Sequence, residues 1–466
     1  MNQSTAPRLR FQIFLFRRAA AEPSLGLDSF LPDDTVRQVL DEEGATWRHV
    51  FYTPWLTFWA FFWQALSPDH SCRAAVKRIT AALARRGTTV DNEDTSPYCK
   101  ARARLPESVF SRLARLLGRK SHDAIPEEWL WCGHRVKLVD GTTVSMPDTP
   151  ANQAEYPQSP SQKPGLGFPI ARMVVVFCLA AGSVLDAAVG RYQGKQTGET
   201  ALFRKVWEGS LSAGDVLLAD RYYSSYFELA MLKQRGVDSV FRLHQRRRND
   251  YRRGRRLGEE DHVVTWERPE RPTWMDEATY ESIPETFEVR VVRIRIAVRG
   301  FRTRVLDVVT TLLDDDVYTK RDLAALYRRR WEAELNLRSI KVELGLDVLR
   351  CKTPAMVRKE IWMGLLAYNV IRAAMNQASR ASEKEPWELS FKGALQSMLA
   401  SAEGLREAGK ARRGSLWESL LRLIADDEVG HRPNRAEPRA RKRRPKPYPL
   451  LTVPRQQAKE LLLQTG

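Results

Sequence analysis

The order of strand-like and helix-like segments between residues 136 and 244 constrains the fold more than any other feature of this chain. VKLVDGTTVSM alternates like a strand, and ARMVVVFCLAAGSVLDAAVGRYQG predicts a hairpin whose turn is Ala-Gly-Ser. Helices are predicted over 199–211 and over SSYFELAMLKQRG, where Ser224 or Ser225 is the N-cap and Gly236 the stop. Each precedes an apolar strand, DVLLADRYY or DSVFRLH. This order predicts an α/β fold with a mixed sheet flanked by helices.

Segments of different character lie on both sides of this region, because a chain of 466 residues is too long for one ordinary core. Helices are predicted before it, over 32–43, 55–66, 72–86 and 107–117. Two alternating runs after it, FEVRVVRIRIAV and TRVLDVVTTLL, predict further strands. The predicted division is a helical domain over 1–130, a core over 131–244 and 319–425, a β-rich insertion over 245–318, and a basic proline-rich tail over 426–466.

The chain carries 75 lysines and arginines against 57 aspartates and glutamates, which gives a net charge of +18. An excess of this size predicts a polyanionic partner, nucleic acid first and an anionic membrane second, with charge kept for solubility as the alternative. The charge is concentrated in QRRRNDYRRGRR, with seven arginines in twelve residues, and in Arg439–Lys446, with six basic residues. TSPYCKARARLP makes the helical domain a candidate DNA-binding module, with a structural domain without a ligand as the alternative.

Neither a membrane-spanning helix nor a disulfide framework is predicted. The most apolar stretch, Trp55–Leu66, is too short to span a bilayer and predicts a buried helix, and Arg17 and Arg18 interrupt the apolar run near the N-terminus. Five cysteines are scattered without CxxC spacing, which supports neither a disulfide framework nor a zinc site. We therefore expect a soluble protein of the reducing cytoplasm that binds no membrane.

YRRRWEAELNLRSIK, residues 327–341, is the most informative single segment. In a regular helix of about 100° per residue, one sector roughly 60° wide holds Tyr327, Arg330, Glu334 and Lys341, with Arg338 beside it. The apolar stripe that should face the core consists of Ala333, Leu337, Ile340 and Leu344. The residues predicted on the opposite side are Glu332, Asn336, Ser339 and Glu343, and we expect the two glutamates to face solvent. An amphipathic helix with internal ion pairs, such as Glu334 with Arg330 or Arg338, is the alternative explanation.

Two aspartates are predicted at the ends of strands. Asp140 closes KLVD before GTT, and Asp220 closes VLLAD before RYYSS. Either alone could be a turn former or a helix cap. Together with Glu334, however, they make a cluster of three carboxylates geometrically plausible, and such a cluster suits hard divalent cations, chiefly Mg²⁺. Two ions about 3.5–4 Å apart can activate a water or hydroxyl and stabilise the leaving oxygen of a phosphodiester.

The segments LVDGTTVSM, LLADRYYSSY and YRRRWEAELNLRSIK resemble the first Asp, second Asp and Glu motifs of the DDE transposases, in the family named after insertion sequence four. The helix signature of that family is Tyr, two residues, Arg, three residues, Glu, six residues, Lys, and Tyr327, Arg330, Glu334 and Lys341 match it without a gap. Similarity in DTPANQAEYPQSPSQKPGLGFPIARM, LGEEDHVVTWERP and KRRPKPYPLL extends the resemblance over most of the chain. It implies a ribonuclease-H-like catalytic core, interrupted by a β-rich insertion, in a cut-and-paste transposase.

The resemblance also implies roles for individual residues. Asp140, Asp220 and Glu334 would be catalytic and hold Mg²⁺, with Mn²⁺ able to substitute. The residues implied to contact DNA are Tyr327, Arg330 and Lys341, with Arg221 and Arg338 as further candidates. The helical domain would recognise the terminal inverted repeats, and the partners would be double-stranded DNA and a second copy of the chain in a paired-end complex. The implied location is the bacterial cytoplasm, in association with the nucleoid.

The reaction implied by the resemblance begins with hydrolysis of one strand at the element's end. The freed 3′-hydroxyl attacks the opposite strand to form a hairpin, water reopens the hairpin, and the 3′ ends attack target DNA. Relatives relieve the sharp bend of the hairpin by flipping a base onto an aromatic side chain. Trp266, Trp274 and Trp331 are candidates for that side chain, and each is equally a candidate packing residue.

Other classes of enzyme find little support. The seven histidines form no HxxxH or HExxH spacing, no Walker loop GxxxxGK[ST] is present, and Gly165 and Gly167 precede a strand and predict a turn. Two alternatives to a transposase stay open. One is a nuclease with the same core that cuts without rejoining, and the other is a domesticated or inactive DNA-binding derivative of a transposase.

Overall fold

The computed structural model describes residues 30–47, 51–85, 87, 94–247, 249–295, 305–430 and 449–465. One nine-stranded sheet, with strand order β3-β2-β1-β4-β5-β9-β8-β7-β6, runs through this part of the chain. Its strands are β1 (Val136–Ser145), β2 (Ile170–Cys178), β3 (Val184–Arg191), β4 (Val216–Ala219), β5 (Asp238–Arg242), β6 (Arg255–Gly258), β7 (Asp261–Glu267), β8 (Thr286–Arg295) and β9 (Val305–Thr310). Every predicted strand is therefore present.

The first five strands form the core of the sheet. β1 pairs antiparallel with β2, and β2 with β3, through the predicted hairpin, whose turn residue Gly182 has a φ of +65°. On the other side of β1, β4 and β5 follow in parallel. This order and these directions make the ribonuclease-H-like core that the resemblance implied, so the predicted α/β fold class is confirmed.

The β-rich insertion extends the same sheet. β9 pairs with β5, and β8, β7 and β6 follow in antiparallel order. Arg290 of β8 is fully buried, and its Nε and Nη2 donate to the two carboxylate oxygens of Asp261 at 2.8 and 2.5 Å. Its Nη1 donates to the backbone oxygen of Tyr318 at 2.6 Å. These bonds tie the insertion strands to the segment that leads into the helix after them.

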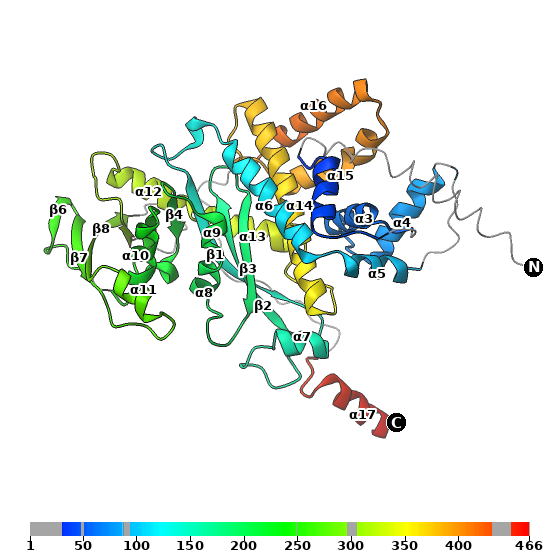
Figure 1. Ribbon diagram of the computed structural model, residues 1–466, viewed down its shortest axis with the longest axis horizontal. Helices are drawn as coiled ribbons and strands as arrows, with labels where there is room; N and C mark the ends of the chain where they lie inside the picture. Colours follow the sequence, from blue (N-terminus) through cyan, green and yellow to red (C-terminus); the bar gives the residue numbers. More distant parts are fainter. Residues whose placement is uncertain are drawn as a thin grey trace, which may run out of the picture.

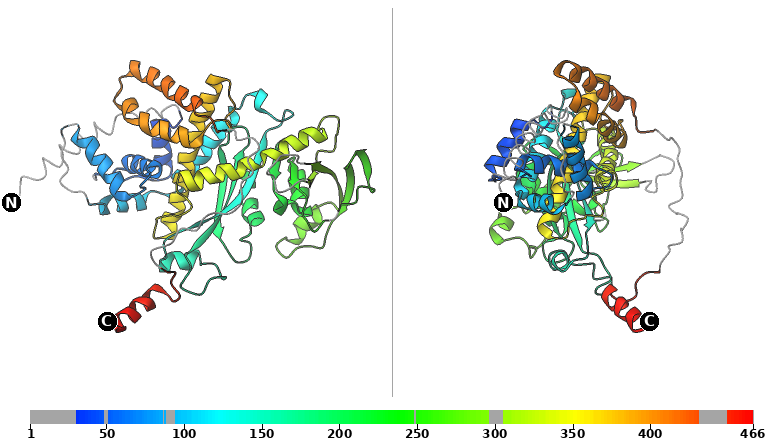
Figure 2. Two further views of the ribbon diagram at one scale, coloured as in Figure 1. Left: turned by 180° about the vertical axis from the view of Figure 1, so that it is seen from behind. Right: turned by 90° about the vertical axis from the view of Figure 1, so that its right-hand side faces the viewer.

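Helices cover both faces of the sheet. One face packs against α8 (Glu199–Arg204), α9 (Trp207–Ser210) and α10 (Tyr226–Gln234). The single helix predicted over 199–211 is thus two short ones, and Ser225 is the N-cap of α10 as predicted. The other face packs against α6 (Glu107–Asp123), α12 (Lys320–Arg329), α13 (Trp331–Arg338) and α14 (Pro354–Ser382). Figure 2 shows α12 and α13 crossing this face end to end.

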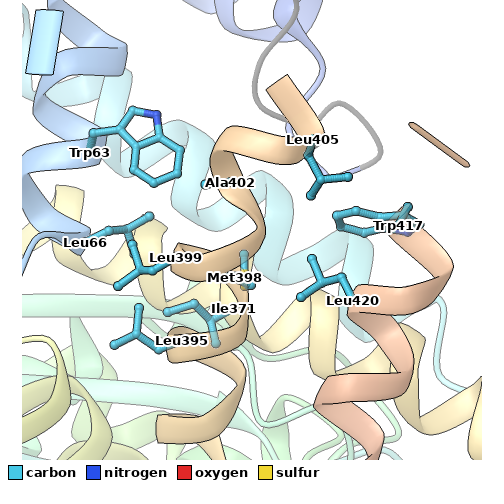
Figure 3. Close-up of a pocket in the computed structure, with 10 residues that line it drawn as sticks. All are labelled: Trp63, Leu66, Ile371, Leu395, Met398, Leu399, Ala402, Leu405, Trp417 and Leu420. Carbon is cyan, nitrogen blue, oxygen red and sulfur yellow. The ribbon is translucent and has the colours of Figure 1, made fainter. Parts of the chain in front are cut away.

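Two N-terminal helices, α2 (Asp33–Glu42) and α3 (Pro54–Leu66), share a hydrophobic core with α14, α15 (Phe391–Glu407) and α16 (Lys410–Asp426). The next two, α4 (Cys72–Ala84) and α5 (Ser96–Arg104), pack against α3 in a separate, smaller core. The predicted buried helix is α3, and a small apolar cavity between it and the later helices is lined by Trp63, Met398 and Trp417, among others (Figure 3). The predicted boundary at residue 130 stays a prediction.

The molecule is elongated, with the insertion strands at one end and the N-terminal helices at the other (Figure 1). The remaining short elements are η2 (Glu127–Trp129), α7 (Pro150–Glu155) and α11 (Glu277–Ser282), and α17 (Arg455–Thr465) stands away from the body. The basic run Arg439–Lys446 lies outside the described residues. Among the helices that the structure describes, none is long and apolar enough to cross a membrane.

Candidate active site

The two predicted aspartates lie side by side where β4 ends. Asp140 sits in the middle of β1, which continues to Ser145 along β2, so the prediction that it closes its strand is wrong. Each β1 residue pairs with the β4 residue 80 positions later, which places Asp140 level with Asp220. Asp220 follows the last residue of β4 and caps the short 3₁₀ helix η3 (Arg221–Tyr223), accepting the Tyr222 N–H at 2.8 Å.

The helix predicted to carry Glu334 is not continuous, and this corrects the angular projection. α12 begins at the Thr319 capping box and ends before Arg330, where α13 takes over. The Arg330 N–H bonds the Tyr327 oxygen at 3.2 Å, a tight three-residue step, and the Leu344 N–H bonds the Ser339 oxygen at 3.1 Å, a wide five-residue step. The second step belongs to the π-helix η4 (Ser339–Glu343). The predicted apolar stripe is nevertheless buried throughout.

The side of α13 predicted to face solvent is covered. The Glu332 side chain is only 18% exposed, against 39% for Glu334, and Asn336 is buried. The expectation for Glu332 is therefore wrong, because α14 and the segment before α15 pack on this side. A cavity of about 240 Å³ lies between them, and Arg338 lines it together with Glu332 and Arg372. Arg338 is thus not brought together with the aspartates, and its contact with DNA stays a prediction.

Arg330 joins the helix to the aspartate strand. Its Nη2 lies 2.5 Å from Oε1 of Glu334, and its Nη1 lies 3.9 Å from Oδ2 of Asp140. The ion pair expected for an ordinary amphipathic helix is therefore present, but it also lies beside Asp140. The side chains of Arg330 and Asp140 are only 19% and 18% exposed, which strengthens the attraction between them, whereas Glu334 is 39% exposed.

The remaining residues of the signature surround this ion pair. The Lys341 Nζ donates to Oγ1 of Thr142 on β1 at 3.2 Å. Tyr327 is 8% exposed, and burial raises the pKa of its hydroxyl to about 12, with Arg330 and Arg242 opposing the rise and Asp220 and Glu334 adding to it. Arg221 is exposed beside Asp220, and its Nη1 donates to Oε1 of Gln245 at 2.8 Å.

A fourth carboxylate, Glu199, lies near the aspartates and was not predicted. Glu199 opens α8, and its side chain lies over Gly141, so that a Cβ built on Gly141 would be 2.7 Å from Oε1 of Glu199. Burial raises the pKa of Asp140 to about 6; the Gly141 N–H and Arg330 oppose the rise, and Asp220 and Glu199 add to it. The one signal in the sequence was the position of Glu199 at the start of the helix predicted over 199–211.

The donor set suits a hard divalent cation, since it consists of carboxylate oxygens. In the part of the chain that the structure describes, no three carboxylate, imidazole or thiol groups lie close enough together to hold one ion. The Arg330 guanidinium lies between two of these carboxylates, at 2.5 Å from Glu334 and 3.9 Å from Asp140. The same guanidinium marks a place where positive charge is favourable, so the residues fit a cation once Arg330 moves away.

The family model for the transposase DDE domain matches residues 131–370, just over half of the chain, and this range contains Asp140, Asp220 and Glu334. The chain belongs to the DDE transposase family. It is 27% identical over 439 residues to the transposase InsG of insertion sequence element IS4 from Escherichia coli K12, which spans 92% of this chain and 94% of that protein. The predicted membership of the insertion-sequence-four family is thus confirmed.

Two further similarities are weaker, one because it is short and the other because its sequence identity and TM-score are low. A stretch of 57 residues is 40% identical to the transposase for insertion sequence element IS421 from Escherichia coli, which is 12% of this chain and 15% of that protein. A cryo-EM structure of the piggyBac transposase synaptic complex with hairpin DNA aligns over 88% of each chain, with 10% identity and a TM-score of 0.42.

Proposed function

We propose that this protein binds the terminal inverted repeats of an insertion sequence, cleaves DNA at the element ends and joins the 3′ ends to target DNA. The main support is the placement of Asp140, Asp220 and the Arg330–Glu334 ion pair around the end of β4, in a chain that belongs to the DDE transposase family. A carboxylate cluster at this point suits phosphodiester chemistry, which needs oxygen ligands for divalent cations.

Asp140, Asp220 and Glu334 are the residues proposed to hold Mg²⁺ or Mn²⁺. When bound, such cations supply charge that activates the attacking oxygen and stabilises the leaving oxygen of an in-line displacement. The carboxylates must be ionised for this purpose, and burial works against ionisation at Asp140, whose pKa is raised to about 6. With a pKa of about 6, Asp140 is mostly ionised at neutral pH, and it becomes protonated in the cation-free protein only as the pH falls below about 6.

Arg330 is proposed to exchange Glu334 for a phosphate of the DNA end. A guanidinium forms paired hydrogen bonds to phosphate as readily as to carboxylate, so a phosphate beside Asp140 competes for it. The exchange would free Glu334 for the cation site. Lys341, at 3.2 Å from Thr142, and the Tyr327 hydroxyl, which burial keeps protonated, supply further donors around the same place.

Trp331 is the proposed base-stacking residue for a hairpin intermediate. Its side chain is 48% exposed directly after Arg330. By contrast, Trp266 is buried with the Arg247 guanidinium over its ring at 3.9 Å, and the Arg204 guanidinium lies 3.7 Å over the ring of Trp274. An exposed indole beside a phosphate-binding arginine offers a free face on which a flipped base can stack.

DNA would extend from this site over the insertion, and two copies of the chain are proposed to act in a paired-end complex. The arginine-rich run begins at Gln245, which bonds Arg221 at the edge of the site. Its exposed arginines continue the positive surface away from Asp220. This arrangement and the net charge of +18 support duplex DNA as the partner.

The proposal is tested with the variants Asp140→Asn, Asp220→Asn and Glu334→Gln on a labelled duplex that ends in the element's inverted repeat. Each should abolish strand cleavage in Mg²⁺ or Mn²⁺ and leave duplex binding in a gel-shift assay close to that of the wild type. Glu343→Gln, further along the same helical segment, is the matched control and should cleave normally.

Normal cleavage by one of the three variants would remove that residue from the proposed site. If the wild-type protein binds the duplex but fails to cleave it in both Mg²⁺ and Mn²⁺, the result would instead favour an inactive derivative. Cleavage without any joined product would favour a nuclease that cuts without rejoining.

A further inference from the structure

A polar cavity of about 640 Å³ lies at the edge of the sheet where β1 and β4 begin. Its walls are the end of α6, the start of β1 and the loop that joins α9 to β4. Lys137, which lines the cavity, precedes Asp140 by three residues on β1, so about 10 Å of strand separates their backbones. The cavity is therefore close to the candidate active site, but it shares no residue with it.

Three cations line this cavity, and only one of them has a carboxylate partner. Nζ of Lys137 lies 2.5 Å from Oδ2 of Asp215, and the two side chains are only 4% and 5% exposed. Arg135 and Arg119 instead donate to backbone oxygens, at 2.5 and 3.0 Å, and neither forms an ion pair with a described residue. A guanidinium carries five N–H donors, so most of the donors of both arginines remain for another acceptor.

The acidic residues that line the cavity do not cancel this charge. Asp215 is held by Lys137 and by the backbone N–H of the loop at 2.6 Å. Glu208 pairs with Arg235, which lies outside the cavity, at 2.6 Å. Asp123 is the one lining carboxylate that has no cation partner among the described residues. Two unpaired guanidinium groups against one unpaired carboxylate leave the cavity positive.

His122 is a buried residue of this cavity whose hydrogen bonding is incomplete. It is 8% exposed, it lines the cavity, and its Nδ1 has no hydrogen-bond partner in the described part of the chain. Burial lowers the pKa of its ring to about 4, and Lys137 and Arg135 lower it further. Both cations therefore act on the same ring, which places them around one point. An anion bound there would be attracted by both, and it would favour the protonated ring.

The cavity adjoins a groove along α6. The groove measures about 870 Å³ and shares Arg119 and Asp123 with the lining of the cavity. Arg112, Arg115 and Lys120 of α6 also line it, so basic residues continue along the helix away from β1. A free phosphate fills a small part of this combined space, whereas a chain of phosphates follows it.

We propose that the cavity at the start of β1 and β4 binds a phosphate of the DNA backbone through Arg119 and Arg135, as a contact separate from the cleaved end. The proposal rests on the proposed function, because it takes duplex DNA as the partner. Guanidinium groups bind phosphate through paired hydrogen bonds, and a cleft lined by positive charge concentrates the potential that attracts it. The same chemistry suits a free phosphate, and the groove along α6 favours DNA over it.

The salt dependence of duplex binding by the full-length protein tests the proposal. In a plot of log K against log salt concentration, Arg119→Ala/Arg135→Ala should make the slope shallower by up to about 2, and Arg119→Ala alone by up to about 1. Arg119 is exposed, so the single variant tests the contact without disturbing a buried group. Arg412→Ala/Arg422→Ala is the matched control, because it removes the same formal charge from α16, which lines neither the cavity nor the groove.

Equal slopes for the wild type, Arg119→Ala and Arg119→Ala/Arg135→Ala would overturn the inference, and normal cleavage of the inverted repeat by the wild type would then leave the proposed function standing. Because the slope is measured on any duplex, a wild type that fails to cleave would count against the proposed function alone. A wild type that binds no duplex would overturn both.

The ring of His122 reports on the cavity directly. Its Cε1 signal in the nuclear magnetic resonance spectrum of histidine-labelled protein is identified by its loss in His122→Asn, and it should shift when a duplex is added. An unchanged signal at saturating duplex would overturn the inference. A shift with inorganic phosphate alone at equal ionic strength, together with an unchanged salt slope in Arg119→Ala/Arg135→Ala, would overturn DNA as the ligand in favour of a free phosphate.

Discussion

Arg330 places one positive charge between a strand carboxylate and a helix carboxylate, Asp140 and Glu334. A guanidinium is not deprotonated in proteins, so this charge is present at every working pH. It offsets the repulsion among the buried acids while no cation is bound, and it is also the side chain that best matches a phosphate. Under the proposed function, one residue therefore links the arrival of DNA to the release of Glu334.

Replacing this charge should have opposite effects on cation binding and on DNA processing. In the DNA-free protein, Arg330→Ala should raise the affinity for Mn²⁺ by about tenfold, because a repelling charge close to the site is removed. The yield of hairpin from a pre-nicked end should fall, because the phosphate loses its partner. Arg329→Ala is the control, since Arg329 pairs with Glu332 on the covered side. A weaker Mn²⁺ affinity in Arg330→Ala would contradict this role.

Asp140 should make the stability of the cation-free protein depend on pH. Its pKa is raised from 3.8 to about 6, mainly by burial, so its contribution to stability is full below the unfolded value and is lost as the pH rises through about 6. Asp140→Asn, which cannot ionise, should be more stable than the wild type by on the order of 2 kcal/mol at about pH 8, and the gap should close near pH 4. Urea unfolding in the presence of a chelator measures the free energy of unfolding of both proteins. A difference between them that does not change with pH would contradict the prediction.

The helix that carries Glu334 shows where prediction from sequence reached its limit. The apolar stripe from Ala333 to Leu344 was predicted correctly, because apolar residues recur at helical spacing whatever happens between them. The break at Arg330 and the π-helix η4 were not predicted, since the helix propensities of the residues in this segment do not reveal them. The covering of Glu332 was missed for the same reason: it depends on α14, which lies far along the chain.

Arg372 of α14 should hold α13 in place. Its guanidinium is buried and donates to Oδ1 of Asn336, while its Nε donates to the Tyr368 hydroxyl at 2.9 Å. Arg372→Met leaves both acceptors buried without this donor, and it should lower the free energy of unfolding by about 3 kcal/mol. Arg380→Met, on the exposed end of the same helix, is the control and should cost far less. Chemical denaturation measures both, and equal losses would contradict the positioning role.

The candidate site can be predicted from the sequence only as far as fixed spacing allows. Asp140, Asp220 and Glu334 stand in motifs whose residues are separated by constant numbers, so a sequence comparison finds them. Glu199 has no such motif, because its place beside Gly141 depends on how α8 crosses β1. The ion pairs of Arg330 were open to two explanations in the sequence, and only the pairing of β1 with β4 places them beside the aspartates.

At the scale of the whole molecule, the insertion connects the site to the largest described concentration of arginines. β9 pairs with β5, so β6 to β9 continue the sheet that carries the aspartates. Arg255 and Arg256 of β6 are exposed on the last strand, and neither pairs with a carboxylate among the described residues. A duplex that follows the sheet from Asp220 toward β6 would therefore meet positive charge that no acidic neighbour neutralises.

This arrangement should appear in the salt dependence of DNA binding. In a plot of log K against log salt concentration, where K is the binding constant, each phosphate contact adds about 0.9 to the steepness of the slope. The double variant Arg255→Ala/Arg256→Ala should therefore make the slope shallower by up to about 2. Arg412→Ala/Arg422→Ala on α16, away from the insertion, removes the same formal charge and should change the slope much less (Figure 1). Fluorescence anisotropy with an inverted-repeat duplex measures the slope over a range of salt concentrations. Equal reductions in the two double variants would mean that net charge, and not the path over the insertion strands, determines binding.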